Sequence, residues 1–104
     1  MSMKPVTDRG EVAIDFPDKA YMGQFGRGSS FDAHADDNGF MLKLSRVTEE
    51  KREVEIHLHH FLFADILAEL AQSVVARPPI DDVHRKALAA AARALAHALE
   101  RRTR

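Results

Sequence analysis

The 104-residue sequence contains no cysteine and no tryptophan, and it lacks any long apolar run. Without cysteine the chain cannot form a disulfide, a Cys-ligated zinc or iron–sulfur site, or a thiolate nucleophile. A membrane-spanning helix needs roughly 18 consecutive apolar residues, and the first residues lack the apolar segment of a signal peptide. The sequence therefore predicts a cytoplasmic protein with no membrane partner.

The sequence also lacks an excess of charge of either sign, because its formal net charge is −1. The distribution is uneven: residues 1–59 hold eight Lys/Arg and 11 Asp/Glu, whereas residues 80–104 hold six and three. A domain that binds long nucleic acid usually has a stronger basic excess. The Ala- and Arg-rich C-terminal segment suggests a GC-rich coding sequence and thus a bacterial or phage origin.

What is present fits a small globular protein, with 45% hydrophobic and 30% charged residues. Residues 1–10 show no periodicity and are predicted to be a flexible N-terminal arm. Residues 11–104 are predicted to form a single α+β domain, which is the commonest domain size.

Apolar and polar residues alternate through much of residues 11–59, which predicts an antiparallel β-meander of about five strands. The segment around Asn38-Gly39 predicts a tight hairpin turn, because Asn and Gly tolerate positive φ. Residues 48–50 predict the next turn. These two turns set the register, which places all apolar rows on one face. The expected opposite pairs are Ala33 with Leu42 or Leu44, Leu42 with Ile56, Leu44 with Val54, and Lys43 with Glu55.

After residue 60 the hydrophobic period becomes helical. Two C-terminal α-helices are predicted, at about 61–76 and 81–102, packing on one face of the sheet. Arg77-Pro78-Pro79 should end the first helix, because a residue before proline avoids the α region. The predicted core is the following set: Phe40, Leu42, Leu44, Val54, Ile56, Leu58, Phe63, Ile66, Leu67, Leu70 and Leu95.

Histidines offer weak candidates for a metal site. His57 and His59 lie on one face of a strand, as strand-borne zinc or iron ligands do, and His34 could share that face. Lys43 lies between these strands and would repel a cation, and no HExxH-type frame accompanies the pair. Polar residues on a solvated sheet face are the simpler interpretation, and no metal or other cofactor is predicted.

Two basic features could bind an anion. Arg27 lies in the glycine-containing loop 26–30, but the loop joins two predicted strands and lacks the helix N-terminus of a phosphate site. In the last helix, Lys86, Arg93, His97 and Arg101 fall near one stripe at helical spacing, which suits phosphates or an acidic partner. A solvated face with C-terminal charges placed for the helix dipole is the alternative.

No residue pattern indicates a catalytic nucleophile or a general acid–base pair, so the chain is predicted not to be an enzyme. The leading hypothesis is a non-catalytic protein–protein interaction protein, such as a small bacterial or phage inhibitor or adaptor, forming a homodimer. Binding of an anionic ligand, a nucleotide or nucleic acid, through the basic helix is the alternative. A metal-dependent enzyme using His57 and His59 is the third.

Overall fold

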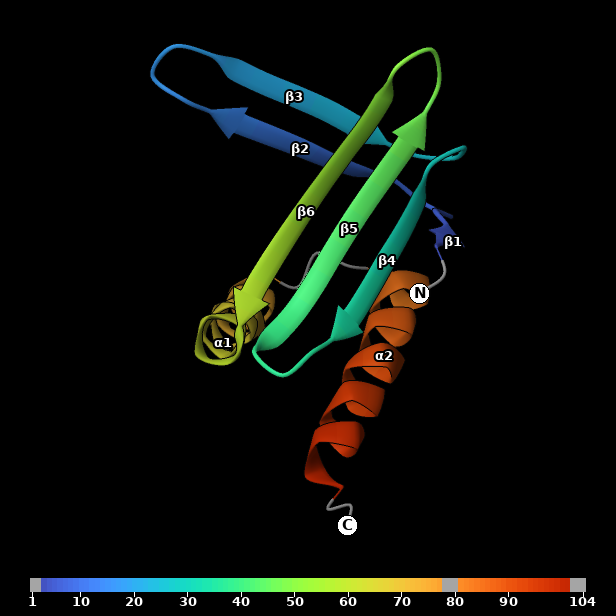
Figure 1. Cartoon of the computed structure of the whole chain (residues 1–104). Coiled ribbons are helices and arrows are strands. Elements are labelled where there is room, and N and C mark those ends of the chain that lie inside the picture. The colour runs from blue at the N-terminus through green and yellow to red at the C-terminus, as the bar shows by residue number, and fades with distance from the viewer. Residues whose placement is uncertain (1–2, 78–80, 102–104) are drawn as a thin grey trace. The chain divides into compact units, whose positions relative to one another are not determined.

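The computed structural model describes residues 3–77 and 81–101, and it shows antiparallel strands followed by two C-terminal helices, the predicted α+β class (Figure 1). The chain consists of two compact units, Met1–Leu67 and Ala68–Arg104, and the boundary between them lies inside the first helix. The elements follow in chain order: β1 (Lys4–Pro5), β2 (Gly10–Asp15), β3 (Ala20–Phe25), β4 (Ser30–Ala35), β5 (Gly39–Val47), β6 (Lys51–His59), α1 (His60–Ala76) and α2 (Asp82–Glu100).

Four of the six strands form one sheet, in the order β1-β4-β5-β6, while β2 and β3 form a separate two-stranded hairpin. The registers of β4, β5 and β6 confirm the prediction. Ala33 lies opposite Leu42, Leu42 opposite Ile56, and Lys43 opposite Glu55. The apolar rows therefore share one face, because side chains alternate between the faces of a strand.

The N-terminal strands differ from the predicted meander. Lys4–Pro5 pair with Phe31 and Ser30 at the beginning of β4, and the Val6 N–H donates to the Ser29 oxygen. This edge of β4 is thus occupied by β1. For this reason β3, which is joined to β4 by the turn at Gly26–Ser29, does not pair with β4. Flexibility of residues 1–10 stays a prediction.

The turn between β4 and β5 lies at the predicted place but has a different physical basis. Gly28 is the only described residue with positive φ, so neither Asn38 nor Gly39 adopts that conformation. Instead, the Asp36 carboxylate accepts the N–H groups of Asn38 and Gly39, each at 2.9 Å. A Cβ at Gly39 would overlap the Leu58 carbonyl oxygen of the neighbouring strand. Glycine is therefore needed for close strand approach.

The side chains predicted to form the core are much less buried than expected. Phe25, 4% exposed, is the only buried hydrophobic side chain among the described residues. Of the predicted core residues, Leu42, Ile56, Leu67 and Leu70 are exposed, and the other seven are half-buried. The prediction of a fully buried core was therefore wrong for these residues. The contact observed on that face is Phe63 of α1 against Phe40, with ring centroids 4.5 Å apart.

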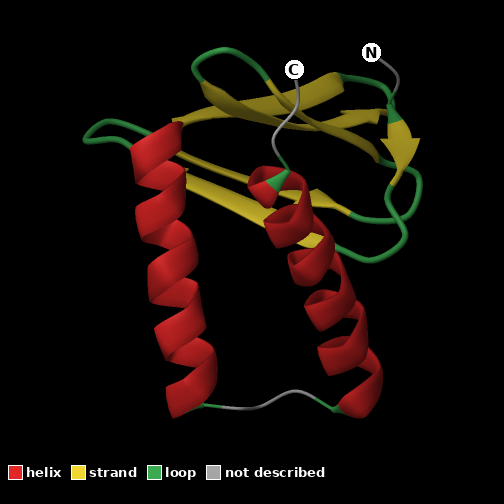
Figure 2. Cartoon of the chain, turned by 90° about the horizontal axis from the view of Figure 1, so that it is seen from below, coloured by secondary structure: helices red, strands yellow, loops and turns green. Residues whose placement is uncertain are grey.

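Both helices form close to their predicted limits (Figure 2). Asp81 caps the N-terminus of α2 by accepting the His84 N–H at 2.9 Å. Arg101 follows its last residue, and its N–H donates to the His97 oxygen. The predicted terminator Pro78-Pro79 and residue 102 lie outside the described residues, and packing of both helices on one sheet face stays a prediction.

Candidate functional site

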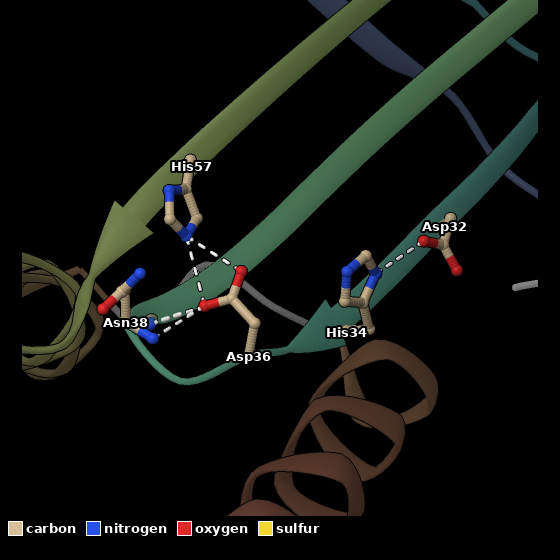
Figure 3. Close-up of polar contacts among 6 residues, drawn as sticks. Asp32, His34, Asp36, Asn38 and His57 are labelled. Atoms are coloured by element: carbon tan, nitrogen blue, oxygen red, sulfur yellow. Dashed lines mark hydrogen bonds and ion pairs between the residues drawn. The ribbon is translucent and has the colours of Figure 1, made fainter.

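Paired acidic and histidine side chains cover the polar face of the four-stranded sheet (Figure 3). His34 Nδ1 lies 2.7 Å from Asp32 Oδ2 on the same strand. His57 Nε2 of β6 lies 3.1 Å from Asp36 Oδ2, just after β4. Each pair joins a carboxylate to a histidine ring nitrogen. Polar side chains on this face therefore interact with one another.

Asp36 is the centre of this network. The Asn38 N–H, the His57 side chain and the Gly39 N–H all favour its ionised form, and together they lower the pKa of the Asp36 carboxyl below 3.8. Asp36 therefore both closes the β4–β5 turn and holds His57.

Lys43 lies opposite Glu55, as predicted. Its Nζ lies 3.4 Å from carboxylate oxygens of both Glu53 and Glu55. The hydrogen bond that Lys43 donates to Glu55, together with the negative charge of Glu53, raises the pKa of Lys43. The charges of the β5–β6 pair are thus largely compensated within the sheet.

The weak metal candidates do not converge on a ligand set. His34 and His57 are each held by a different aspartate, and the His57 and His59 rings lie 5.0 Å apart, edge to face. Among residues 3–77 and 81–101, no group of three or more His, Asp or Glu side chains could hold a metal ion. This geometry gives the metal-enzyme hypothesis no support.

Arg27 lies in the tight turn between β3 and β4. Gly28 takes φ of 94°, and the Ser29 N–H donates to the Gly26 oxygen at 2.9 Å. That N–H is therefore occupied by the turn and does not point to an anion. The Ser29 hydroxyl is buried and has no hydrogen-bond partner among the described residues.

The basic residues predicted in the last helix belong to the other unit, Ala68–Arg104. Lys86, Arg93 and His97 lie within α2, and Arg101 is its C-cap residue. Their spacings of seven, four and four residues keep them within one stripe of the helix. Arg85, by contrast, is engaged by Asp82, at 2.8 Å. Binding of a ligand or partner by these residues stays a prediction.

A hollow in the first unit was not predicted. This arginine cleft of about 730 Å³ lies between the β2–β3 hairpin and the turn end of β5 and β6. The following residues line it: Glu11, Val12, Ala13, Met22, Gly23, Gln24, Arg46 and Arg52. Arg46 Nη1 donates to the Gln24 carbonyl oxygen at 3.4 Å, which ties the sheet to the hairpin.

Arg46 and Arg52 lie directly opposite each other in the β5–β6 ladder. Like charges at such a position repel and lower the stability of the sheet. Arg52 has one acidic neighbour, Glu50, at 4.0 Å. The sequence held a signal for this pair, since both arginines lie the same distance from the 48–50 turn. The cleft itself depends on where the hairpin packs.

A second hollow, the hairpin cleft, has a volume of about 370 Å³ and lies under the same hairpin. Val12, Ile14, Tyr21 and Phe25 line it from the hairpin, and residues 51–54 of β6 line it from the sheet. Figure 1 shows the hairpin crossing β6 and projecting beyond it. Ile14 and Tyr21 of the hairpin are 36% and 51% exposed.

Comparisons with protein-family models, with curated proteins and with solved structures give no match for this chain. None of the described helices is long and apolar enough to cross a membrane.

Proposed function

We propose that this chain is a non-catalytic protein-binding protein that docks onto a partner through the arginine cleft and the adjoining hairpin. In this proposal it is a small inhibitor or adaptor acting in the cytoplasm of a bacterial or phage-infected cell. The observation that carries the proposal is the exposure of Met22 beside two arginines: the Met22 side chain is 80% exposed.

The residue types at this surface are those that protein interfaces favour. Methionine, aromatic residues and arginine are enriched at the centre of interfaces, whereas lysine and glutamate are depleted. Met22 and Arg46 line the cleft, and exposed Tyr21 and Phe16 are neighbours in the hairpin, with ring centroids 6.3 Å apart. A flexible thioether next to flat rings can adapt to an apolar partner surface.

Charge indicates what the partner supplies. The facing arginines Arg46 and Arg52 concentrate positive charge at one wall of the cleft. An aspartate or glutamate from a partner would relieve their repulsion and could bind either guanidinium in bidentate fashion. The expected partner surface therefore carries an acidic side chain beside an apolar one.

The test compares capture of proteins from the native host by three forms of the chain, with identification by mass spectrometry. The forms are wild type, Met22→Ser/Arg46→Ala/Arg52→Ala, and a matched control, Arg93→Ala/Arg101→Ala. A partner captured by wild type and by the control, but lost with the triple variant, supports the proposal. A partner retained by the triple variant contradicts the proposed surface, and conversion of a small-molecule substrate by the wild type contradicts the non-catalytic assignment.

The stripe of α2 favours a second candidate, the binding of an anionic ligand such as a nucleotide or nucleic acid. Lys86, Arg93 and Arg101 share one side of a single helix, and phosphate binding by such cations weakens as salt is raised. Titration with a fluorescent oligonucleotide at two salt concentrations tests it. Binding that is lost in Arg93→Ala/Arg101→Ala and at high salt supports it, whereas no binding by the wild type at low salt rules it out.

A further inference from the structure

The free edge of β6 is the longest unpaired strand edge in the described part of the chain. β6 ends the strand order β1-β4-β5-β6 and runs for nine residues. An edge of this length presents a row of unpaired N–H and C=O groups, which natural sheets usually cover, shorten or interrupt. β6 contains no proline, and among residues 51–59 the ladder to β5 continues without a bulge.

The hydrogen-bond pattern shows which groups of β6 face outward. The Asp36 N–H donates to the Gly39 oxygen, and antiparallel pairs alternate between bonded and non-bonded from there. Leu42 and its partner Ala33 in β4 form a non-hydrogen-bonded pair, so the N–H and C=O groups of Leu42 point toward β6. Leu42 and Ile56 are therefore a hydrogen-bonded pair. The N–H and C=O groups of Glu53, Glu55 and His57 then point to the free side.

We infer that this edge pairs, antiparallel and around Ile56, with the β6 edge of a second copy of the chain. In this register Glu55 faces the second copy's His57, and Glu53 faces its His59, twice each by symmetry. On the other face Val54 meets the second copy's Leu58, and Ile56 meets Ile56. Polar pairs that can hydrogen-bond and apolar pairs at facing positions stabilise antiparallel ladders.

Neighbouring registers are less favourable. Pairing centred on Glu55 would place two glutamates opposite each other, and pairing centred on Val54 would place Glu53 opposite Glu55. Pairing centred on His57 shortens the ladder and places His57 opposite itself. Of these registers, the one centred on Ile56 places no two glutamates opposite each other and keeps residues 53–59 paired along their whole length.

The ends of β6 add a further reason for a second copy. Phe61, the second residue of α1 and two residues after the end of β6, is 87% exposed. The β2–β3 hairpin crosses β6 and projects beyond its free edge (Figure 1), and Ile14 and Tyr21 of this hairpin are also exposed. An antiparallel pair brings the end of one β6 to the beginning of the other. Apolar side chains left exposed in one copy thus approach those of the second.

The absence of cysteine makes the register testable with single-thiol variants. Ile56→Cys places a thiol opposite its own symmetry mate, whereas Leu42→Cys places one on the same face but inside the sheet, opposite Ile56. Under mild oxidation we expect Ile56→Cys to form a covalent dimer at least about tenfold faster than Leu42→Cys, since a disulfide requires Cα atoms within roughly 7 Å. Equal rates for the two variants would overturn the pairing.

A second measurement does not depend on disulfide chemistry. His59 lies opposite Gly39 within its own sheet, so His59→Glu adds no like-charged pair across that ladder but faces Glu53 of the second copy. We expect His59→Glu to raise the dimer dissociation constant about tenfold and His59→Gln to change it little, measured by light scattering over a dilution series. A wild-type monomer throughout the series overturns the inference. Because the arginine cleft is not required for this pairing, a monomer that still captures its partner leaves the proposed function intact.

Discussion

Phe25, the last residue of β3, is the one buried hydrophobic side chain among the described residues. Truncation of a well-packed phenylalanine costs about 3–5 kcal/mol. We expect Phe25→Ala to lower the free energy of unfolding by an amount in this range, as measured by urea denaturation. Phe16→Ala is the matched control, since Phe16 is 56% exposed and its loss should be nearly neutral. Similar losses for both would contradict the burial of Phe25.

Gly39 lies where the backbone of β5 comes close to that of β6. A Cβ there would overlap the Leu58 carbonyl oxygen and lie 2.7 Å from the His59 Cα. Gly39→Ala should therefore destabilise the sheet by about 1–3 kcal/mol, the usual cost of overpacking. Gly10→Ala meets only the Leu44 side chain at 4.0 Å and should be tolerated. Comparison of the two melting temperatures checks this, and an unchanged Gly39→Ala protein would contradict the close approach.

Asp36 makes the stability of the β4–β5 turn depend on pH. Its pKa is lowered in the folded state, chiefly by the Asn38 N–H and with help from His57 and the Gly39 N–H. A lowered carboxyl pKa gives stability that is present above the ordinary value of 3.8 and is lost as pH falls through the lower, folded value.

Asp36→Asn keeps an oxygen acceptor for the turn but removes the charge. We expect it to lower the melting temperature by a few degrees at about pH 5, with the difference vanishing below the folded pKa of Asp36. Melting curves of both proteins across this range measure the effect. A difference that persists unchanged at about pH 2 would show that the charge of Asp36 is not its source.

At the scale of elements, α2 depends on its N-cap. The Asp81 carboxylate accepts the His84 N–H, and this hydrogen bond is the main reason for its lowered pKa. Asp81→Ala should reduce the helical circular dichroism signal and lower the melting temperature by a few degrees, whereas Asp81→Ser, which retains a capping oxygen, should preserve most of both. Equal losses in the two variants would argue against capping.

The strands that the sequence predicted best are those whose turns it located. Turns near Asn38 and Glu49 set the pairing of Lys43 with Glu55, because period-two alternation allows only one register with all apolar rows on one face. The pairing of Lys4–Pro5 with β4 carried no periodic signal. The separate β2–β3 hairpin is joined to the sheet by a long-range contact, Arg46 with the Gln24 oxygen, that no local pattern encodes.

At the scale of the whole molecule, the candidate site could be predicted only in part. The basic stripe of α2 follows from helical spacing alone, so it was visible in the sequence. The arginine cleft is formed by β2, β3, β5 and β6 together, and its walls are brought together by packing. Arg46 and Arg52 were foreseeable as a facing pair, but Met22 beside them was not.

The central claim is that Met22, Arg46 and Arg52 form the surface that meets a partner protein. The most direct measurement is the amount of one identified partner captured by Met22→Ser/Arg46→Ala/Arg52→Ala relative to wild type, with both proteins shown to be folded by circular dichroism. The account predicts loss of most of the captured partner, with full capture by Arg93→Ala/Arg101→Ala. Full capture by the folded triple variant would contradict it.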